Sequence, residues 1–285
     1  MNRKQAGLTL VEVIIASAIL SAVVLMAMSV LFSTSRTAAS GQVMAQLEQR
    51  GNRILGFCRD QMSTASFKHQ TFTNLGIVTS PNSYNSAIAF QVCGPAVVGP
   101  TGAATLQFGY PDPRVPNQTF NANLACFLRF EADTVYQESS GSPAATQAAN
   151  WTSPGLPAFS PLTTVVLNQD VNGNGSQYDT FVCGRIMKYV VDETTNTVIG
   201  RERLDDQVLL RVSGTGPGAF SGDVDADGQV DLLFCFASSA GVADTGLTGA
   251  TGSGILINVW HGSLDDTGKL FILRNNKSLI HFRQE

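Results

Sequence analysis

The sequence predicts an α+β protein in which a long N-terminal helix, membrane-spanning in its first half, packs on an antiparallel β-sheet domain. Three observations predict this class. The segment 8–32 is apolar, helical spacing of apolar residues continues to about residue 62, and short β-type runs separated by turn residues follow residue 66. A period near 3.6 residues indicates a helix, and a period of two indicates strands.

The apolar segment is long enough to cross a lipid bilayer. It holds 25 residues, from Leu8 to Phe32, and a single charged residue, Glu12. As a helix it measures about 37 Å at ~1.5 Å per residue, against a hydrocarbon core of about 30 Å. Arg3 and Lys4 precede the segment, and positive charge there favours a cytoplasmic N-terminus. We therefore expect one membrane span, with the rest of the chain outside the cytoplasm.

Glu12 is the candidate functional residue of this helix. A carboxylate inside a membrane costs on the order of 3 kcal/mol, so such a residue needs a partner. If the chain is cut after Gly7, Leu8 gains a free α-amine. That amine, on a neighbouring helix, complements the charge of Glu12. Such a pair would dock one helix start beside another and fix their axial register.

These N-terminal residues resemble the type IV pilin-like family, which includes type IV pilins and type II secretion pseudopilins. The resemblance lies in Gly7, the apolar run, and the segment Leu8-Thr9-Leu10-Val11-Glu12-Val13. It implies cleavage by prepilin peptidase after Gly7, N-methylation of Leu8, and assembly with other pilins or pseudopilins at an inner-membrane platform. Leu8 departs from the phenylalanine that is usual in the family. The implied location is the bacterial inner membrane, with the C-terminal domain in the periplasm and the helix later in a filament.

Two simpler interpretations compete with this one. An ordinary secretory signal would use Ala16-Ser17-Ala18 as its cleavage site, but Glu12 would then lie inside its apolar core. A plain membrane anchor accounts for the hydrophobicity and leaves Gly7 and Glu12 without a role. The pilin-like interpretation accounts for all of these features.

Helical spacing beyond the membrane predicts an amphipathic continuation of the same helix. We expect one helix from about Thr9 to about Met62, in which Gly41 and Gly51 each cost up to ~1 kcal/mol relative to alanine. The predicted divisions are a leader at 1–7, a transmembrane and filament-core helix at 8–32, its amphipathic continuation at 33–66, and a β-rich globular domain at 67–285. The apolar side of the continuation comprises Val43, Met44, Leu47, Ile54, Leu55, Cys58 and Met62.

Short β-type runs follow the helix, as expected for an antiparallel sheet. The polar segment Asp192 to Asn196 predicts a hairpin turn, and segments 94–104, 111–123 and 138–160 are expected to be loops. The expected strands are 87–92, 105–110, 125–130, 163–167, 180–191, 197–201, 208–212, 230–236, 255–260 and 270–273.

Two acidic loops are candidate calcium sites, because alternating oxygen ligands around a glycine turn suit this hard cation. The stronger candidate is formed by Asp223, Asp225, Asp227 and Asp231, and resembles the loops of dockerin-like and integrin-like calcium sites. The weaker candidate is formed by Asp170, Asn172, Asn174 and Asp179. Phe234 stands where an EF-hand has glutamate. We therefore expect a calcium ion that stabilises the fold, not one that acts as a switch. The alternative for both is a solvated turn without metal.

The five cysteines contain no CxxC pair, which disfavours a zinc or thioredoxin-type site. In an oxidising compartment, Cys183 and Cys235 form one plausible disulfide, and Cys93 and Cys126 another. Cys58 would remain single and pack from the helix. Five reduced, buried cysteines are an equally acceptable interpretation.

Composition indicates a β-rich, loop-rich extracytoplasmic domain and gives no sign of a basic nucleic-acid-binding face. Only 14% of residues are charged and the net charge is −4, which becomes −6 if Arg3 and Lys4 are removed. Neither a serine-hydrolase, a zincin nor a P-loop motif is present, and no small-molecule substrate is indicated. Of the histidines, His261 lies near Asp265 and Asp266. A surface loop position is the favoured interpretation for it, with a catalytic role as the alternative.

We therefore expect a non-enzymatic minor pilin or pseudopilin of a type IV pilus or a type II secretion pseudopilus. At 278 residues after loss of the leader, the chain is large for a subunit that must pack at every filament position. The alternative is a membrane-tethered, calcium-dependent adhesin or substrate-binding module.

Overall fold

The computed structural model describes most of the helix and the central strands of the chain. The described residues are 9–62, 65–66, 83–84, 87–93, 97–98, 104–105, 108–117, 119–142, 144, 146–147, 156–158, 160–171, 175, 177–213, 234–237, 254–264 and 270–281. Contacts divide the chain into two units, residues 1–46 and 47–285.

Helix α1, Leu10–Met62, begins one residue after the predicted start and ends at the predicted residue. In the first unit its apolar side chains are exposed, from Leu10 at 77% to Phe32 at 66%. The hydroxyl groups in this stretch donate to carbonyls of the preceding turn, as Ser21 does to Ser17 at 2.8 Å. Because these hydroxyls are satisfied within the helix, they do not oppose burial in lipid.

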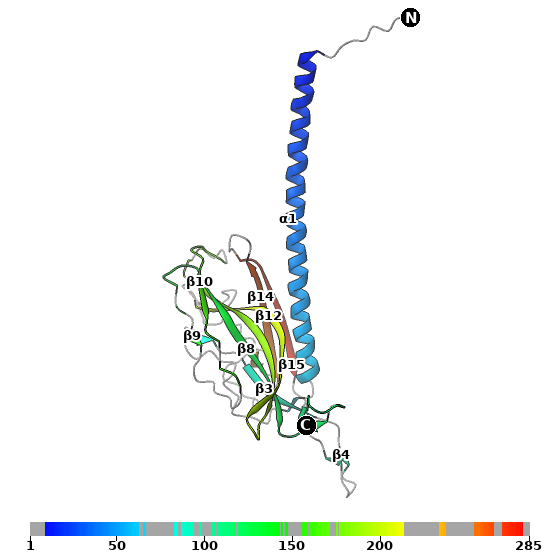
Figure 1. Ribbon diagram of the computed structural model, residues 1–285, viewed down its shortest axis with the longest axis vertical. Helices are drawn as coiled ribbons and strands as arrows, with labels where there is room; N and C mark the ends of the chain where they lie inside the picture. Colours follow the sequence, from blue (N-terminus) through cyan, green and yellow to red (C-terminus); the bar gives the residue numbers. More distant parts are fainter. Residues whose placement is uncertain are drawn as a thin grey trace, which may run out of the picture. The chain divides into compact units, whose positions relative to one another are not determined.

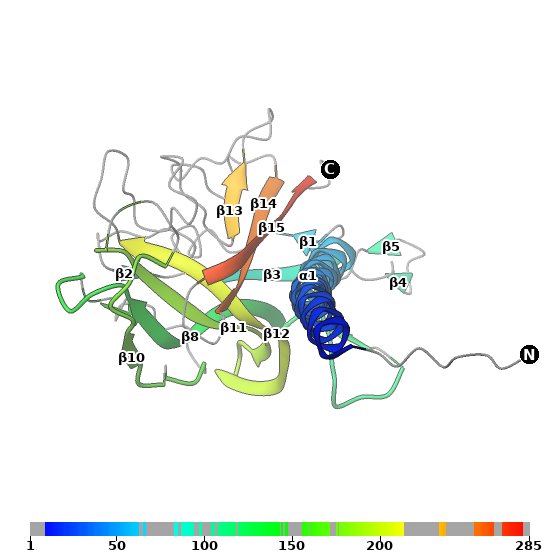
Figure 2. The ribbon, with the colours of Figure 1, turned by 90° about the horizontal axis from the view of Figure 1, so that it is seen from above.

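The described strands form an 11-stranded sheet and two short two-stranded sheets (Figures 1 and 2). The main path runs β13-β14-β12-β11-β8-β3-β6-β7, with β1, β10 and β15 attached to β3, β8 and β14. Its longest members are β8 (Leu124–Gln137), β11 (Thr180–Asp192), β12 (Thr197–Ser213), β14 (Gly254–Leu264) and β15 (Leu270–His281). The others are β1 (Ala65–Ser66), β3 (Ala87–Cys93), β6 (Phe108–Pro111), β7 (Phe120–Asn121), β10 (Thr163–Val166) and β13 (Phe234–Ala237). The short sheets pair β2 (Ser83–Tyr84) with β9 (Thr146–Gln147), and β4 (Val97–Val98) with β5 (Ala104–Thr105).

The last four turns of α1 belong to the second unit and pack on the sheet (Figure 1). Arg50 donates to Asp206 of β12 at 3.0 Å, and Arg53 donates to the carbonyl oxygen of Leu204. The residues that α1 buries recur at helical spacing: Leu47, Gly51, Ile54, Cys58 and Met62. Leu47, Ile54, Cys58 and Met62 belong to the predicted apolar stripe, whereas Val43, Met44 and Leu55 are only partly buried.

Strand alternation divides the core between the two faces of the sheet. Leu128 and Phe130 of β8 share the main cluster with Ile54 of α1. Phe127 and Tyr189 belong to a separate, smaller cluster, against which Leu156 packs. Since side chains alternate along a strand, this second cluster lies on the face opposite α1. Strand β8 is therefore buried on both faces.

The structure confirms the α+β class and modifies some strands. The predicted runs 197–201 and 208–212 form one strand, β12, and the predicted run 105–110 is divided between β5 and β6. Strand β10 pairs with β8 in parallel, so the sheet is mixed. The predicted hairpin turn joins β11 to β12, and Asn196 adopts a φ of 52° there. Asparagine tolerates this left-handed conformation well.

Candidate functional site

Glu12 lies in the first turn of α1 and bonds reciprocally with Thr9. Its Oε2 accepts from the backbone N–H of Thr9 at 2.8 Å and from the Thr9 hydroxyl at 3.0 Å. The N–H of Glu12 donates to Thr9 Oγ1 at 3.3 Å. This is a capping box, in which two N–H groups that the helix leaves unpaired are satisfied by side chains.

Sequence reasoning found Glu12 and missed Thr9. The spacing Thr9-x-x-Glu12 is the signature of a capping box, so the signal was present. The capping box holds the carboxylate in the first turn of the helix. Gly7 and Leu8 lie outside the described residues, and cleavage and methylation there stay predictions.

The weaker acidic loop is anchored by a carboxylate that the sequence did not single out, Glu138. Its Oε1 accepts from the N–H of Val171 at 2.8 Å, and its Oε2 accepts from the N–H of Asp179 at 2.9 Å. Glu138 and Asp179 are both fully buried. Asp170 accepts from the N–H of Gly175, which has a φ of 83°. One buried side chain thus ties both ends of the loop together.

This arrangement concentrates negative charge at the loop. Burial raises the pKa of Glu138 above its ordinary value, and repulsion from Asp179 and Asp170 raises it further, while hydrogen bonds from the loop backbone oppose both effects. A cation would relieve the repulsion. Nevertheless, within the described residues no group of three or more His, Cys, Asp or Glu side chains is arranged to hold a metal ion. Asn172, Asn174 and the stronger candidate, Asp223 to Asp231, lie outside the described residues.

The strand order is incompatible with the predicted disulfide between Cys183 and Cys235. Cys183 lies on β11 and Cys235 on β13, with β12 and β14 between them. Three strand spacings of about 4.8 Å amount to roughly 14 Å, beyond the roughly 7 Å that a disulfide can bridge.

The second predicted pair is also separated, this time along the strands. Cys126 pairs with Phe90, three residues before Cys93 on β3, which is about 10 Å at ~3.3 Å per residue. The structure has Cys58, Cys126 and Cys183 as free thiols, with Cys58 buried from α1 as predicted. Burial raises the pKa of Cys126 and of Cys183 to about 12, so these sulfurs stay protonated and unreactive.

His261 is a core residue, which corrects the prediction of a surface loop. It lies on β14, is fully buried, and its Nε2 contacts Oδ2 of Asp205 on β12, which is 2% exposed. Asp265 and Asp266 lie outside the described residues. Because neither member of the pair reaches solvent, no substrate can approach it. The pair joins two strands and is not a catalytic centre.

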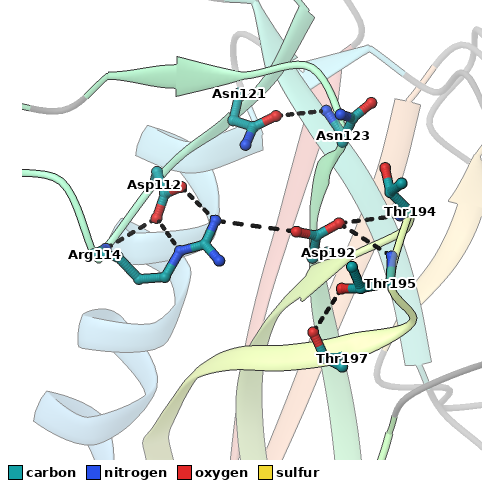
Figure 3. Close-up of polar contacts among 8 residues, drawn as sticks. All are labelled: Asp112, Arg114, Asn121, Asn123, Asp192, Thr194, Thr195 and Thr197. Atoms are coloured by element: carbon teal, nitrogen blue, oxygen red, sulfur yellow. Dashed lines mark hydrogen bonds and ion pairs between the residues drawn. The ribbon is translucent and has the colours of Figure 1, made fainter.

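A polar cluster ties the loop after β6 to the β11–β12 hairpin (Figure 3). Arg114 donates to both carboxylate oxygens of Asp112, through Nε at 2.8 Å and Nη2 at 2.6 Å. Asp192, at 4.0 Å from Arg114 Nη2, also accepts from the N–H of Thr194 in the turn. Hydrogen bonds from Arg114 lower the pKa of Asp112 to about 2. The sequence predicted the turn from Asp192 to Asn196, but it did not predict that the segment with Asp112 and Arg114 contacts this turn.

The features that define a class of protein lie at the N-terminus. Helix α1 is the one described helix that is long and apolar enough to cross a membrane, and its first turn carries Glu12. Residues 2–28 match the prokaryotic N-terminal methylation motif.

This match, together with the apolar helix, fits a type IV pilin-like prepilin and indicates a membrane-anchored protein. The motif implies processing by prepilin peptidase and assembly with other pilin subunits, which are typically structural and non-enzymatic. No curated protein and no solved structure matches the chain.

Proposed function

We propose that this protein is a minor pilin or pseudopilin, a structural subunit of a type IV pilus or a type II secretion pseudopilus. One observation carries the proposal: the exposed apolar surface of α1 from Leu10 to Phe32, with Glu12 as its single charged residue. Such a surface requires lipid or neighbouring helices to cover it. The size of the globular domain favours a subunit used at few filament positions.

The proposed assembly is non-covalent. Prepilin peptidase cuts after Gly7, and the amine of Leu8 is methylated. The protein then rests in the inner membrane as a single-pass subunit, with its second unit in the periplasm. At the assembly platform the helix moves from lipid into the filament core, where Glu12 pairs with the N-terminal amine of an adjacent subunit. The pair replaces part of the hydration that a buried carboxylate loses.

Processing is tested by the intact mass and N-terminal sequence of the protein from its native envelope. A chain that starts at Leu8, with or without one methyl group, supports the proposal. A chain that starts at Met1 would leave Glu12 without the proposed amine, and a start beyond Ala18 would mean ordinary secretion. Either of these two results would overturn the proposal.

The second candidate is a tethered module that binds a surface or substrate in a calcium-dependent way. The observation that favours it is the charge at the loop held by Glu138, where Asp170 and Asp179 raise the pKa of a buried carboxylate. Calcium beside these oxygens would offset that repulsion. The two candidates differ in their need for Glu12, because a tether has no requirement for helix-to-helix pairing.

A further inference from the structure

Three arginines surround one carboxylate on the sheet face opposite α1. Arg129 and Glu131 lie on β8, two residues apart and therefore on one face. Arg185 of β11 pairs in register with Glu131, and Arg201 of β12 pairs with Tyr189 of β11. We call Arg129, Arg185 and Arg201 the arginine cluster.

The carboxylate of Glu131 is shared among all three guanidinium groups. Its Oε1 accepts from Arg129 and from the hydroxyl of Tyr189. Its Oε2 lies 3.5 Å from Nε of Arg185 and 3.9 Å from Nη2 of Arg201. Three positive charges therefore meet one negative charge, which leaves an excess of two positive charges at the cluster.

One donor in the cluster has no acceptor. Arg185 Nε is buried and makes no hydrogen bond within the described part of the chain. Burial alone would raise the pKa of Glu131, yet hydrogen bonds from Tyr189 and Arg129 and the nearby guanidinium charges lower it below its ordinary value. Glu131 is thus ionised, and its Oε2 forms an ion pair with Arg185 Nε at 3.5 Å without a hydrogen bond.

Arg129 is buried and held in place by its contacts, whereas Arg201 and Arg185 are accessible to a ligand. The guanidinium groups of Arg129 and Arg201 stack on the ring of Tyr189, at 5.1 Å and 5.7 Å from its centroid. Arg129 also donates to the carbonyl oxygen of Pro157 at 2.9 Å. The side chains of Arg201 and Arg185 remain 53% and 30% exposed. A ligand would meet guanidinium groups that are already oriented, so binding would immobilise few side chains.

We propose that the arginine cluster binds a carboxylate presented by an acidic segment of a partner protein. A planar carboxylate matches the fork of a guanidinium group and can take two parallel hydrogen bonds from it. A carboxylate placed against the exposed parts of Arg185 and Arg201 would neutralise part of the excess positive charge of the cluster. The identification of the partner as a neighbouring subunit rests on the proposed filament function. The binding of an acidic segment to the cluster does not depend on that function.

Nucleic acid is a poorer ligand for the same surface. Stable binding to nucleic acid needs many phosphates along a basic track, whereas the cluster is compact. The chain carries a net charge of −4, which repels a long polyanion outside the immediate contact. A short acidic segment avoids most of that repulsion. Arg203, exposed on the same strand as Arg201, extends the positive surface by one further charge only.

The experiment measures binding of a fluorescent hexaglutamate peptide to the full chain in detergent micelles, by anisotropy at low and high salt. The wild-type chain should bind the peptide, and salt should weaken binding. Arg201→Ala should weaken it by about tenfold, and Lys277→Ala, the same loss of charge at an exposed position of β15, should change it less than about twofold. Inorganic phosphate should compete only weakly.

A second variant moves the affinity in the opposite direction. Glu131→Gln removes the competing charge and nearly preserves the shape of the side chain, so the folded variant should bind the peptide several-fold more tightly. The proposal is overturned if wild type does not bind, if Arg201→Ala matches Lys277→Ala, if folded Glu131→Gln does not gain affinity, or if phosphate binds as well as the peptide. Since the assay uses single subunits, its failure is distinct from a failure of filament assembly.

Discussion

The carboxylate of Glu12 is held by Thr9, at 2.8 Å from its backbone nitrogen and 3.0 Å from its hydroxyl. The capping box serves the helix start in each separate subunit, because it satisfies donors that lipid cannot. It also keeps the carboxylate at the end of the helix where a neighbouring amine would arrive. The same side chain can therefore cap the helix before assembly and pair with another subunit after it.

Replacing Glu12 by alanine should prevent incorporation into filaments while leaving processing and membrane insertion intact. The variant loses the partner of the incoming amine, whereas the cleavage site and the apolar surface are unchanged. Incorporation is measured by the amount of the protein in sheared or purified filaments, relative to the amount in membranes. Glu48→Ala, the same change at an exposed position of α1, is the control and should assemble normally.

Normal incorporation of the Glu12→Ala chain would contradict the assembly role. Retained binding to a surface or substrate by a Glu12→Ala chain that fails to assemble would instead favour the tethered module. The two candidate functions are thereby separated by one substitution.

Gly51 should be intolerant of a side chain, in contrast to Gly56. A Cβ built at Gly51 would lie 2.1 Å from Nδ2 and 2.9 Å from Cβ of Asn276, and one built at Gly56 meets nothing within 4 Å. Gly51→Ala should therefore lower the free energy of unfolding by about 1–3 kcal/mol. Gly56→Ala should raise it by up to ~1 kcal/mol, because alanine favours the helix. Denaturant unfolding of both variants checks this, and equal effects would contradict close packing of α1 on β15.

The contrast between Gly51 and Asn276 illustrates what the sequence could and could not predict. The helix, its buried stripe and most strands follow from periodicity, which is local. Gly51 was predicted to be only a weak point of the helix, because its neighbour is 225 positions away along the chain. For the same reason the pairing of His261 with Asp205 and the separation of the cysteines in the sheet do not follow from the sequence. Glu138 was missed because it precedes its loop by more than thirty residues.

Thr9 is different, since its spacing to Glu12 is local and was available in the sequence. The apolar surroundings of Glu12 indicate an intermolecular partner, and its spacing to Thr9 indicates a partner within the chain as well. The arginine cluster required the register of three strands, which no pattern within one strand reveals.

The pair of Asp112 and Arg114 should stabilise the protein at neutral pH and lose this effect in acid. The pKa of Asp112 falls from 3.8 to about 2 in the folded chain. A carboxylate with a lowered folded-state pKa contributes stability above its unfolded-state pKa, and that contribution disappears as the pH falls through the folded-state value. Asp112→Asn should therefore lower the unfolding temperature at pH 7, and the difference from wild type should shrink between about pH 4 and pH 2. Asp133→Asn, at an exposed position, is the control.

Calcium removal should destabilise the second unit if the acidic loops hold the ion. A ligand that binds only the folded state stabilises it by RT ln(1 + [L]/Kd), which is about 2.7 kcal/mol at one hundred times the Kd. A chelator should thus lower the unfolding temperature of the wild-type chain, measured in detergent with and without added calcium. Asp225→Ala combined with Asp227→Ala should reduce this dependence strongly, because these residues contribute two of the four carboxylates of the stronger candidate.

A substitution at Asp170 tests calcium binding at the weaker loop independently of the stronger one. Asp170→Asn keeps an acceptor for the N–H of Gly175 but removes one of the charges that raise the pKa of Glu138. If the loop holds no metal, this change relieves repulsion, and the variant should be slightly more stable than wild type with or without calcium. If the loop holds calcium, the variant should be less stable than wild type in calcium and lose less stability on chelation. If chelator does not change the unfolding temperature of the wild-type chain, neither loop binds calcium.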